Sequence, residues 1–348
     1  MQLFYRISEH FEKKLPFVIY RKPNKNKVIG VLQSKDDLVF TEDFSKKAFV
    51  FAPFQLEEKA LIFPFDTAEL LEENYVPDSF ENRSDNFLID NQEEVSQQHI
   101  KLVSQAVSAI KRGDYQKIVL FRREKITLSV DFIKIYKRLL DRFPTAMVYC
   151  WYHPKVGMWA GATPEKLVSI KDNQLMTMSL AGTQAFQEGT APEWGNKEKE
   201  EQQLVTDFIT ETLRPFVENL EISEPKSVRA GNVVHLRTDI CGKLSDKAEF
   251  NQIIRALHPT PAVCGLPKEA ALEYILKNEN YPRKFYTGFL GILDANNATE
   301  LFVNLRCMEL LSDGVFLYTG GGITADSIPE SEWNETVIKS HAMKRVLF

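Results

Sequence analysis

Hydrophobic side chains recur at helical spacing in several parts of the chain. Between residues 96 and 113 one apolar stripe is formed by Ile100, Val103, Val107 and Ile110. Gly113 suits the C-terminal end of such a helix. Similar patterns predict helices over 131–143, from about 197 to 213, and over 246–257, 267–276 and 327–343. The helix that starts near residue 197 is expected to continue with a kink at Pro215.

Apolar runs with strand character separate these helices. They cover 117–128, much of 146–180, 232–242 and much of 285–320, and shorter runs occur at 47–54 and 59–65. Because strands and helices come in runs rather than in strict alternation, the pattern predicts an α+β fold with largely antiparallel sheets. The polar stretch near residues 78–95 is the one candidate linker, and no internal repeat is evident.

Composition and charge narrow the classes of function. The chain has 348 residues, enough for one large domain or two modest ones, and its net charge is -5. The chain therefore has no overall positive charge that would favour binding to nucleic acid or to an anionic membrane. An anionic ligand would have to be bound by local cations or a metal. The N-terminus does not resemble a signal peptide and no apolar run could span a membrane, so we expect a cytoplasmic protein. The widely spaced cysteines indicate reduced thiols rather than disulfides or a zinc site.

Two of the predicted helices carry the pattern E-x-x-E. Glu332 and Glu335 share one helical face with Lys339, and Glu198 and Glu201 repeat the spacing in the helix near residue 197. Two independent solvated faces are one explanation. If the acidic ends face each other, their carboxylates need a cation, and ligation by oxygen alone suits Mg²⁺.

Two stretches of small residues are candidate ligand-binding turns. Gly320, Gly321 and Gly322 follow a strand and precede the C-terminal acidic helix, and Gly182 and Thr183 follow another strand. Such turns let backbone N–H groups approach a carboxylate, although glycine turns after strands are common. Neither stretch matches a nucleotide-binding motif.

Four polar residues lie within or beside apolar strands. Lys117 begins a strand that is apolar on both faces, where a poorly solvated lysine could act as a base; a lysine that reaches out to water is the commoner case. Glu165 lies in a turn before a strand. Arg306, within an apolar strand, needs an anionic partner if it is buried. His235 is a candidate site residue, with a hydrogen-bonded core histidine as the alternative.

Taken in order, nine stretches of the chain resemble motifs of the chorismate-binding enzymes. They are "KIVLFR", "GATPEKL", "SLAGTQ", "KEKEEQQLV", "LHPTPAVCGLP", "YTGFLGILD", "VNLRC", "YTGGGI" and "SEWNETVIK". This family includes isochorismate, salicylate, anthranilate and aminodeoxychorismate synthases. The resemblance covers residues 96–348 and assigns 1–95 to a divergent N-terminal part of the same fold. It implies one large domain of two mainly antiparallel sheets with flanking helices and a site between the sheets.

The resemblance also implies roles for individual residues. Glu201 and Glu335 are expected to bind Mg²⁺, with Glu198 and Glu332 close behind or acting through water. Arg306 and Lys339 are expected on the carboxylates of chorismate. The full expected substrate-binding set is Gly182, Thr183, His235, Tyr286, Arg306, Gly320, Gly321 and Lys339.

Lys117 and Glu165 stand where water-adding members of this family carry a general base and a general acid, which favours an isochorismate synthase. The anthranilate enzymes lack that lysine, and the aminodeoxychorismate enzymes tend to have lysine in place of Ala181. Ala262 occupies a position where salicylate-forming members tend to have threonine, whereas Tyr286 and Leu305 do not discriminate. A salicylate synthase and a non-catalytic chorismate-binding protein are the alternatives. We expect a monomer without a glutamine amidotransferase subunit, and the sequence leaves open whether the product serves menaquinone or siderophore synthesis.

Overall fold

Two large antiparallel sheets organise the chain. The computed structural model describes residues 2–77, 92–186, 188–230, 233–294 and 298–348. The first sheet has the order β15 (Gly265–Leu266), β7 (Lys117–Thr127), β19 (Gly314–Ile323), β18 (Cys307–Leu311), β9 (Gly157–Thr163), β8 (Met147–His153), β1 (Phe17–Arg21), β2 (Lys27–Gln33), β6 (Ala68–Asn74). The second has the order β12 (Val217–Ile222), β14 (Val233–Leu244), β11 (Gln174–Ala185), β10 (Lys166–Lys171), β17 (Ala298–Val303), β16 (Phe289–Leu293), β4 (Ala48–Ala52), β5 (Ala60–Pro64), β3 (Phe40–Thr41), and β13 (Lys226–Ala230) pairs with β14. The strand pairs described are antiparallel, which confirms the predicted α+β class.

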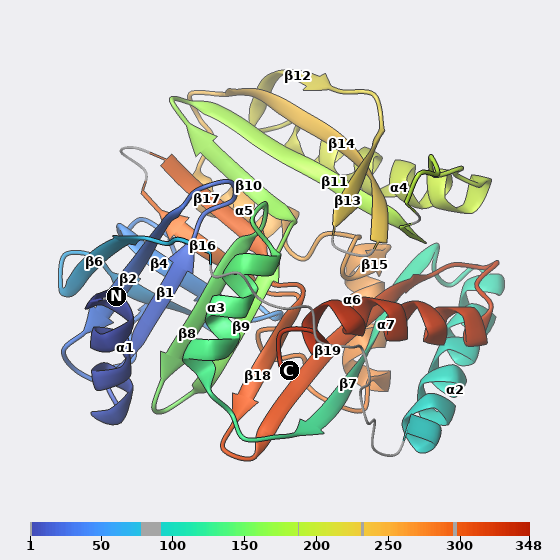
Figure 1. Ribbon diagram of the computed structural model, residues 1–348. Helices are drawn as coiled ribbons and strands as arrows, with labels where there is room; N and C mark the ends of the chain where they lie inside the picture. The colour runs from blue at the N-terminus through green and yellow to red at the C-terminus, as the bar shows by residue number, and fades with distance from the viewer. Residues whose placement is uncertain (1, 78–91, 187, 231–232, 295–297) are drawn as a thin grey trace.

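Helices cover the outer faces of the two sheets (Figure 1). They are α1 (Gln2–Glu12), α2 (Gln92–Lys111), α3 (Phe132–Arg142), α4 (Asn196–Leu213), α5 (Phe250–Leu257), α6 (Lys268–Asn278) and α7 (Pro329–Lys344). The apolar faces of α1 and α3 pack on the first sheet, and those of α4 and α5 pack on the second. Helices α2 and α6 pack with the start of β7 in a further cluster. No helix in these described ranges is both long and apolar enough to cross a bilayer.

The core between the sheets is rich in aromatic side chains. Phe51 of β4 in the second sheet stacks on Trp151 of β8 in the first, with ring centroids 4.9 Å apart, and on Phe285 at 4.3 Å. Strand β1 shows why such strands are apolar on both faces. Its Val18 faces this core, whereas Ile19 faces the helices on the other side.

The structure corrects several local predictions. Helix α1 was not expected from the sequence, and the first 77 residues supply strands to both sheets. Helix α4 ends at Leu213, before Pro215, so there is no kink at the proline. Most of the predicted polar linker, residues 78–91, lies outside the described residues.

The small-residue stretches are not turns. Gly320, Gly321 and Gly322 lie inside strand β19, where they pair with Phe121, Leu120 and Val119 of β7. Gly182 lies inside β11 at a β-bulge opposite β14, with a φ of 69°. Both stretches are therefore held by sheet hydrogen bonds on rigid elements.

Candidate active site

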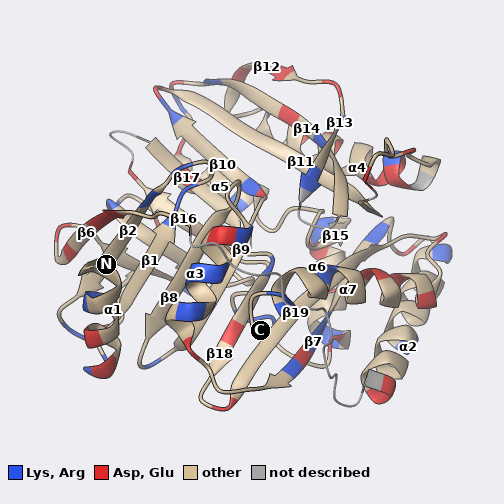
Figure 2. Cartoon of the chain, in the orientation of Figure 1, with Lys and Arg blue, Asp and Glu red and all other residues tan. Residues whose placement is uncertain are grey.

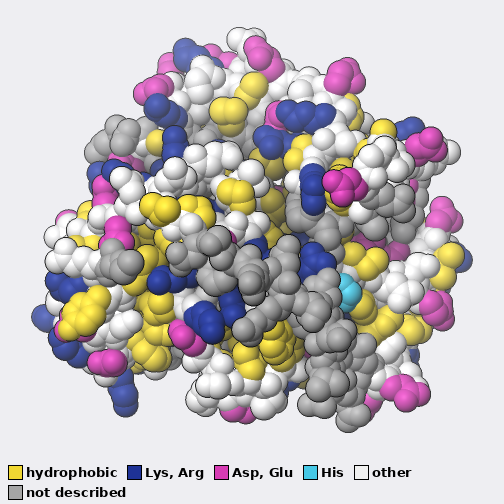
Figure 3. Space-filling view, in the orientation of Figure 1, with side chains coloured by type: hydrophobic (Ala, Val, Ile, Leu, Met, Phe, Trp, Pro, Cys, Tyr) yellow, Lys and Arg dark blue, Asp and Glu magenta, His cyan; other side chains and the backbone are white. Residues whose placement is uncertain are grey.

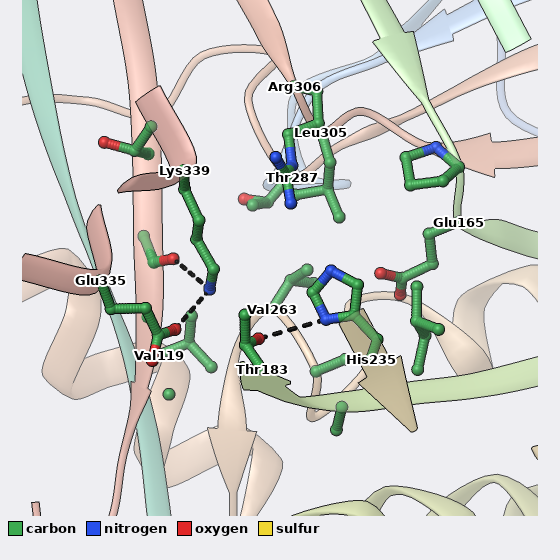
Figure 4. A pocket seen from close by; sticks show the side chains of 18 of the residues that line it. Val119, Glu165, Thr183, His235, Val263, Thr287, Leu305, Arg306, Glu335 and Lys339 are labelled. Carbon is green, nitrogen blue, oxygen red and sulfur yellow. Dashed lines mark hydrogen bonds and ion pairs between the residues drawn. The ribbon is translucent and has the colours of Figure 1, made fainter. Parts of the chain in front are cut away.

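Eleven of the fourteen predicted site residues line one pocket. It lies where β7, β19 and α7 approach β11 and β14, and its empty volume, which includes the mouth open to solvent, is about 780 Å³ (Figure 4). The predicted residues on its wall are Glu165, Gly182, Thr183, Glu201, His235, Tyr286, Arg306, Gly320, Gly321, Glu335 and Lys339. Lys117, Glu198 and Glu332 are not part of this lining.

Lys117 is buried immediately behind the pocket wall. It is 0% exposed, so it does not reach out to water, and its Nζ lies 2.8 Å from Glu201 Oε1. The backbone at Gly322 leaves space for this ion pair. A Cβ at that position would lie 2.5 Å from Glu201 Oε1 and 2.8 Å from Lys117 Cε. Strand β7 and helix α4, far apart in sequence, are thus joined beside a glycine through an ion pair whose lysine is buried.

Glu165 occupies the connection between β9 and β10, as predicted. Its backbone is fixed on both sides, because its N–H donates to Thr163 Oγ1 at 3.3 Å and its carbonyl accepts from Val303 N at 3.0 Å. Glu165 as a whole is 5% exposed. Burial raises the pKa of Glu165 to about 7, against the opposing charges of Lys117 and Lys339. Near neutral pH this group can therefore donate a proton.

The acidic face of α7 points into the protein rather than into water. Glu332 is 2% exposed, and Glu335 Oε1 lies 2.6 Å from Lys339 Nζ. The same ammonium donates to the carbonyl of Gly320 at 3.1 Å. A Cβ on Gly321 would lie 3.5 Å from Glu332 Oε2 and 3.7 Å from Glu335 Oε1, so both carboxylates adjoin this glycine. The solvated-face alternative is therefore wrong for Glu332, whereas Lys339 and Glu335 form a partly exposed i,i+4 pair at the pocket.

The acidic end of α4 approaches the same region from the other side. Glu198 packs against the bulge in β11, with its Cβ 3.1 Å from where a Cβ on Gly182 would lie. Glu201 lies beside Gly322, next to the Gly321 that adjoins the α7 carboxylates. Acidic positions on both helices are visible in Figure 2.

The carboxylates of the two helices suit Mg²⁺ in chemistry. Those of Glu201, Glu332 and Glu335 lie beside the glycines of β19, whereas Glu198 Oε2 lies beside Gly195 at the start of its own helix. In the part of the chain that the structure describes, no group of three or more His, Cys, Asp or Glu side chains is close enough together to hold an ion. Instead, Glu201 and Glu335 are each paired with a lysine.

Arg306 lies in the connection between β17 and β18, with a φ of 49°, and not within a strand as predicted. Burial lowers the pKa of its guanidinium, opposed by Tyr286 and Glu335. Its side chain points into the pocket opposite Lys339 (Figure 4). Two cations from different elements therefore face the same space, as an anionic ligand requires.

His235 of β14 lies between these cations and the bulge at Gly182. Its Nδ1 is 3.0 Å from the carbonyl of Gly182 and 3.1 Å from Thr183 Oγ1. Because a carbonyl can only accept, Nδ1 carries the proton and the ring's Nε2 is an acceptor. Burial, then the charges of Arg306 and Lys339, lowers the pKa of His235 to about 3, so it is neutral near pH 7. It is both a hydrogen-bonded residue and part of the pocket wall.

Sequence reasoning missed some of the wall. Thr287 and Tyr318 line the pocket but were not predicted. The signal for Tyr318 was available, because alternate residues of a strand share a face and Gly320 and Gly322 follow it at that spacing. Thr287 directly follows the predicted Tyr286.

Lys, Arg, Asp and Glu side chains are interspersed on the described part of the face seen in Figure 3. This face, with the net charge of -5, offers no support for nucleic-acid binding.

Comparison with known proteins places this geometry in a family. Residues 56–348 match the model of a chorismate binding enzyme. The chain is 35% identical over 256 residues to the salicylate biosynthesis isochorismate synthase of Pseudomonas aeruginosa, covering 70% of this chain and 53% of that protein. It is 30% identical over 259 residues to the isochorismate synthase EntC of Escherichia coli, covering 71% and 66%. The chain thus spans between half and two thirds of the length of these relatives.

Solved structures show the same fold. The crystal structure assigned to the isochorismate synthase DhbC of Bacillus anthracis superposes with a TM-score of 0.82 at 26% identity, over 99% of each chain. The menaquinone-specific isochorismate synthase MenF of Escherichia coli superposes with a TM-score of 0.79 at 22% identity, over 96% of this chain and 89% of that one. The second likeness concerns the fold alone. With the family match over residues 56–348, these findings show that the chain belongs to the chorismate-binding enzyme family.

Proposed function

We propose that this protein is an Mg²⁺-dependent isochorismate synthase, which converts chorismate reversibly to isochorismate. The observation that supports this most directly is the pairing of two buried groups at one pocket. Glu165, which can donate a proton, lines a space that also holds the cations Arg306 and Lys339. Lys117 is buried directly behind the wall of that space. Chorismate is a dicarboxylate, so a site with two facing cations suits it.

In this proposal the substrate is held by its carboxylates. Arg306 and Lys339 bind them, and backbone N–H groups at Gly182 and Gly321 assist. The neutral His235 offers an acceptor for a hydroxyl of the ring. These contacts fix the ring between Lys117 and Glu165, which is the positioning that such a reaction needs.

Proton transfer is divided between Lys117 and Glu165. Lys117, in its neutral form, takes a proton from a water molecule that attacks the ring carbon next to the carboxylated one. The double bonds shift, and Glu165 donates its proton to the departing hydroxyl, which leaves as water. The protein ends with Lys117 protonated and Glu165 ionised, and one proton returned from the former to the latter restores the starting state.

The Mg²⁺ ion would be held by Glu201 and Glu335, with Glu198 and Glu332 behind them or acting through water. When bound, it would supply positive charge for a substrate carboxylate. For these carboxylates to take the ion, their ion pairs with Lys117 and Lys339 have to be exchanged for metal contacts.

A salicylate synthase is the second candidate, because it forms isochorismate and then expels pyruvate. Ala262 lines the pocket and favours release of isochorismate. Compared with threonine, alanine leaves more room and offers no hydroxyl to fix the enolpyruvyl group.

The test is incubation with chorismate and Mg²⁺, followed by chromatography and a lactate dehydrogenase assay for pyruvate. We expect an equilibrating isomer of the same mass without pyruvate. Stoichiometric pyruvate with fluorescent salicylate would support the lyase instead. Tight chorismate binding in calorimetry without any conversion would indicate a non-catalytic binding protein.

A further inference from the structure

A buried arginine outside the predicted site makes contact with three segments of the pocket wall. Arg283 lies between α6 and β16 and is 4% exposed. Its five N–H donors have five acceptor contacts. They are Nε to Glu279 Oε2 at 2.8 Å, Nη2 to Glu279 Oε1 at 2.6 Å, Nη2 to Val119 O at 2.8 Å, Nη1 to Val263 O at 2.7 Å and Nη1 to Thr287 Oγ1 at 3.2 Å.

Three of these acceptors belong to residues that line the pocket. Val119 lies on β7, two residues after Lys117, and Val263 directly follows Ala262. Thr287 lines the pocket just before β16. Segments that are far apart in sequence therefore meet at one guanidinium group.

The counter-ion strengthens the same connection. Glu279 Oε1 also accepts from Phe121 N at 3.2 Å, so β7 is attached to this pair at two points. The guanidinium lies 4.4 Å from the centre of the Phe54 ring. A lysine could neutralise Glu279, but its three donors on one nitrogen cannot reproduce a planar fork that reaches acceptors in several directions.

We propose that Arg283 is a positioning residue of the active site. It holds the β7 wall beside Lys117, the connection that contains Ala262, and Thr287 in one fixed arrangement. This inference rests on the proposed function, because its effect is measured as chorismate turnover. Arg283 itself does not line the pocket, so its loss is expected to affect turnover more than binding.

The test compares Arg283→Lys with Arg21→Lys. Arg21 is a matched control because it is also buried and donates to backbone carbonyls, those of Leu140 at 2.7 Å and Phe143 at 2.6 Å, which do not line the pocket. Each variant is measured for Tm, for the Kd of chorismate by calorimetry and for kcat. Both should melt earlier. Only Arg283→Lys should lower kcat, by about 10- to 100-fold, with Kd within about threefold, as expected for a small misplacement of reacting groups.

Unchanged kcat in Arg283→Lys, or equal losses in the two variants, would overturn the inference and leave the proposed function standing. Wild-type protein that converts no chorismate would overturn both. If Arg283→Lys does not fold, Glu279→Gln replaces it, since this change keeps the shape but removes the counter-charge. A kcat for Glu279→Gln that is no lower than that of Arg21→Lys then counts against the inference.

Discussion

Replacing Glu165 by glutamine should stabilise the protein at alkaline pH while it inactivates the enzyme. Burial raises the pKa of this carboxyl from the ordinary 4.5 to about 7. Between these two values the folded state keeps a proton that the unfolded chain has released. The free energy of unfolding of the wild type therefore falls as pH rises through this window, by about 3 kcal/mol in total at 1.36 kcal/mol per pKa unit.

Glutamine does not ionise, so the free energy of unfolding of Glu165→Gln should not fall in this pH window through ionisation at position 165. Relative to wild type, the variant should gain up to about 3 kcal/mol between pH ~5 and pH ~8. Because the amide cannot protonate a leaving hydroxyl, turnover should fall about 10²–10⁴-fold, the usual contribution of one acid. A gain in stability together with a loss of activity is expected where burial raises the pKa of a catalytic carboxyl at a cost in folding free energy.

Urea unfolding of both proteins at several pH values, with kcat measured in parallel, tests this expectation. Glu300→Gln is a suitable control. Burial of Glu300 is outweighed by Lys22 and Lys166, so its pKa is lowered and its removal should cost stability at neutral pH. A stability difference between Glu165→Gln and wild type that does not change with pH would refute the argument.

Four further predictions concern the lysine, the metal and the glycine strand. Lys117→Ala should lower kcat about 10²–10⁴-fold with chorismate binding retained in calorimetry, and near-normal turnover would exclude it as the base. Glu335→Lys should abolish turnover with an unchanged circular dichroism spectrum; for the wild type, activity that persists in EDTA would contradict a metal requirement. Gly322→Ala should displace the Lys117–Glu201 pair and lower both kcat and Tm, the latter through about 1–3 kcal/mol of overpacking. Mg²⁺ and chorismate should tighten each other's binding by the same factor, about 5- to 150-fold, in calorimetric titrations performed in both orders, and equal chorismate affinity with and without Mg²⁺ would contradict this.

The shared face of Glu332 and Glu335 could be predicted from the sequence, because it depends on local spacing alone. Residues at i and i+3 on a helix share a face whatever the rest of the fold does, so Glu332 and Glu335 could be placed together in advance. For Lys117, the apolar residues that follow it on both strand faces favoured burial, although a lysine that reaches water is the commoner case.

Features that depend on distant partners could not be predicted in this way. Glycine runs usually indicate turns, but Gly320–Gly322 remain in an extended strand because β7 pairs with them and Lys117 and Glu201 occupy the space beside Gly322. Arg306 is flanked by apolar residues typical of a strand, which is why the sequence predicted a strand there. Its positive φ, which excludes a regular strand, is known only from the structure. Two of the acceptors of Arg283 are backbone carbonyls, and every residue has one, so the sequence does not indicate which of them accept. By contrast, Leu3, Phe4 and Ile7 of α1 did carry a helical pattern that could have been recognised.

Charge balance in the pocket explains why metal and substrate should bind together. The cations Arg306 and Lys339 face the four carboxylates of the two E-x-x-E patterns, which lie at or just behind the same wall. A dicarboxylate alone would therefore add two negative charges to a site that already holds more carboxylates than these cations and is partly removed from water, which is costly. Mg²⁺ supplies the two opposing positive charges. When both enter, the added charges cancel, and this is the physical reason to expect that each ligand raises the affinity of the other.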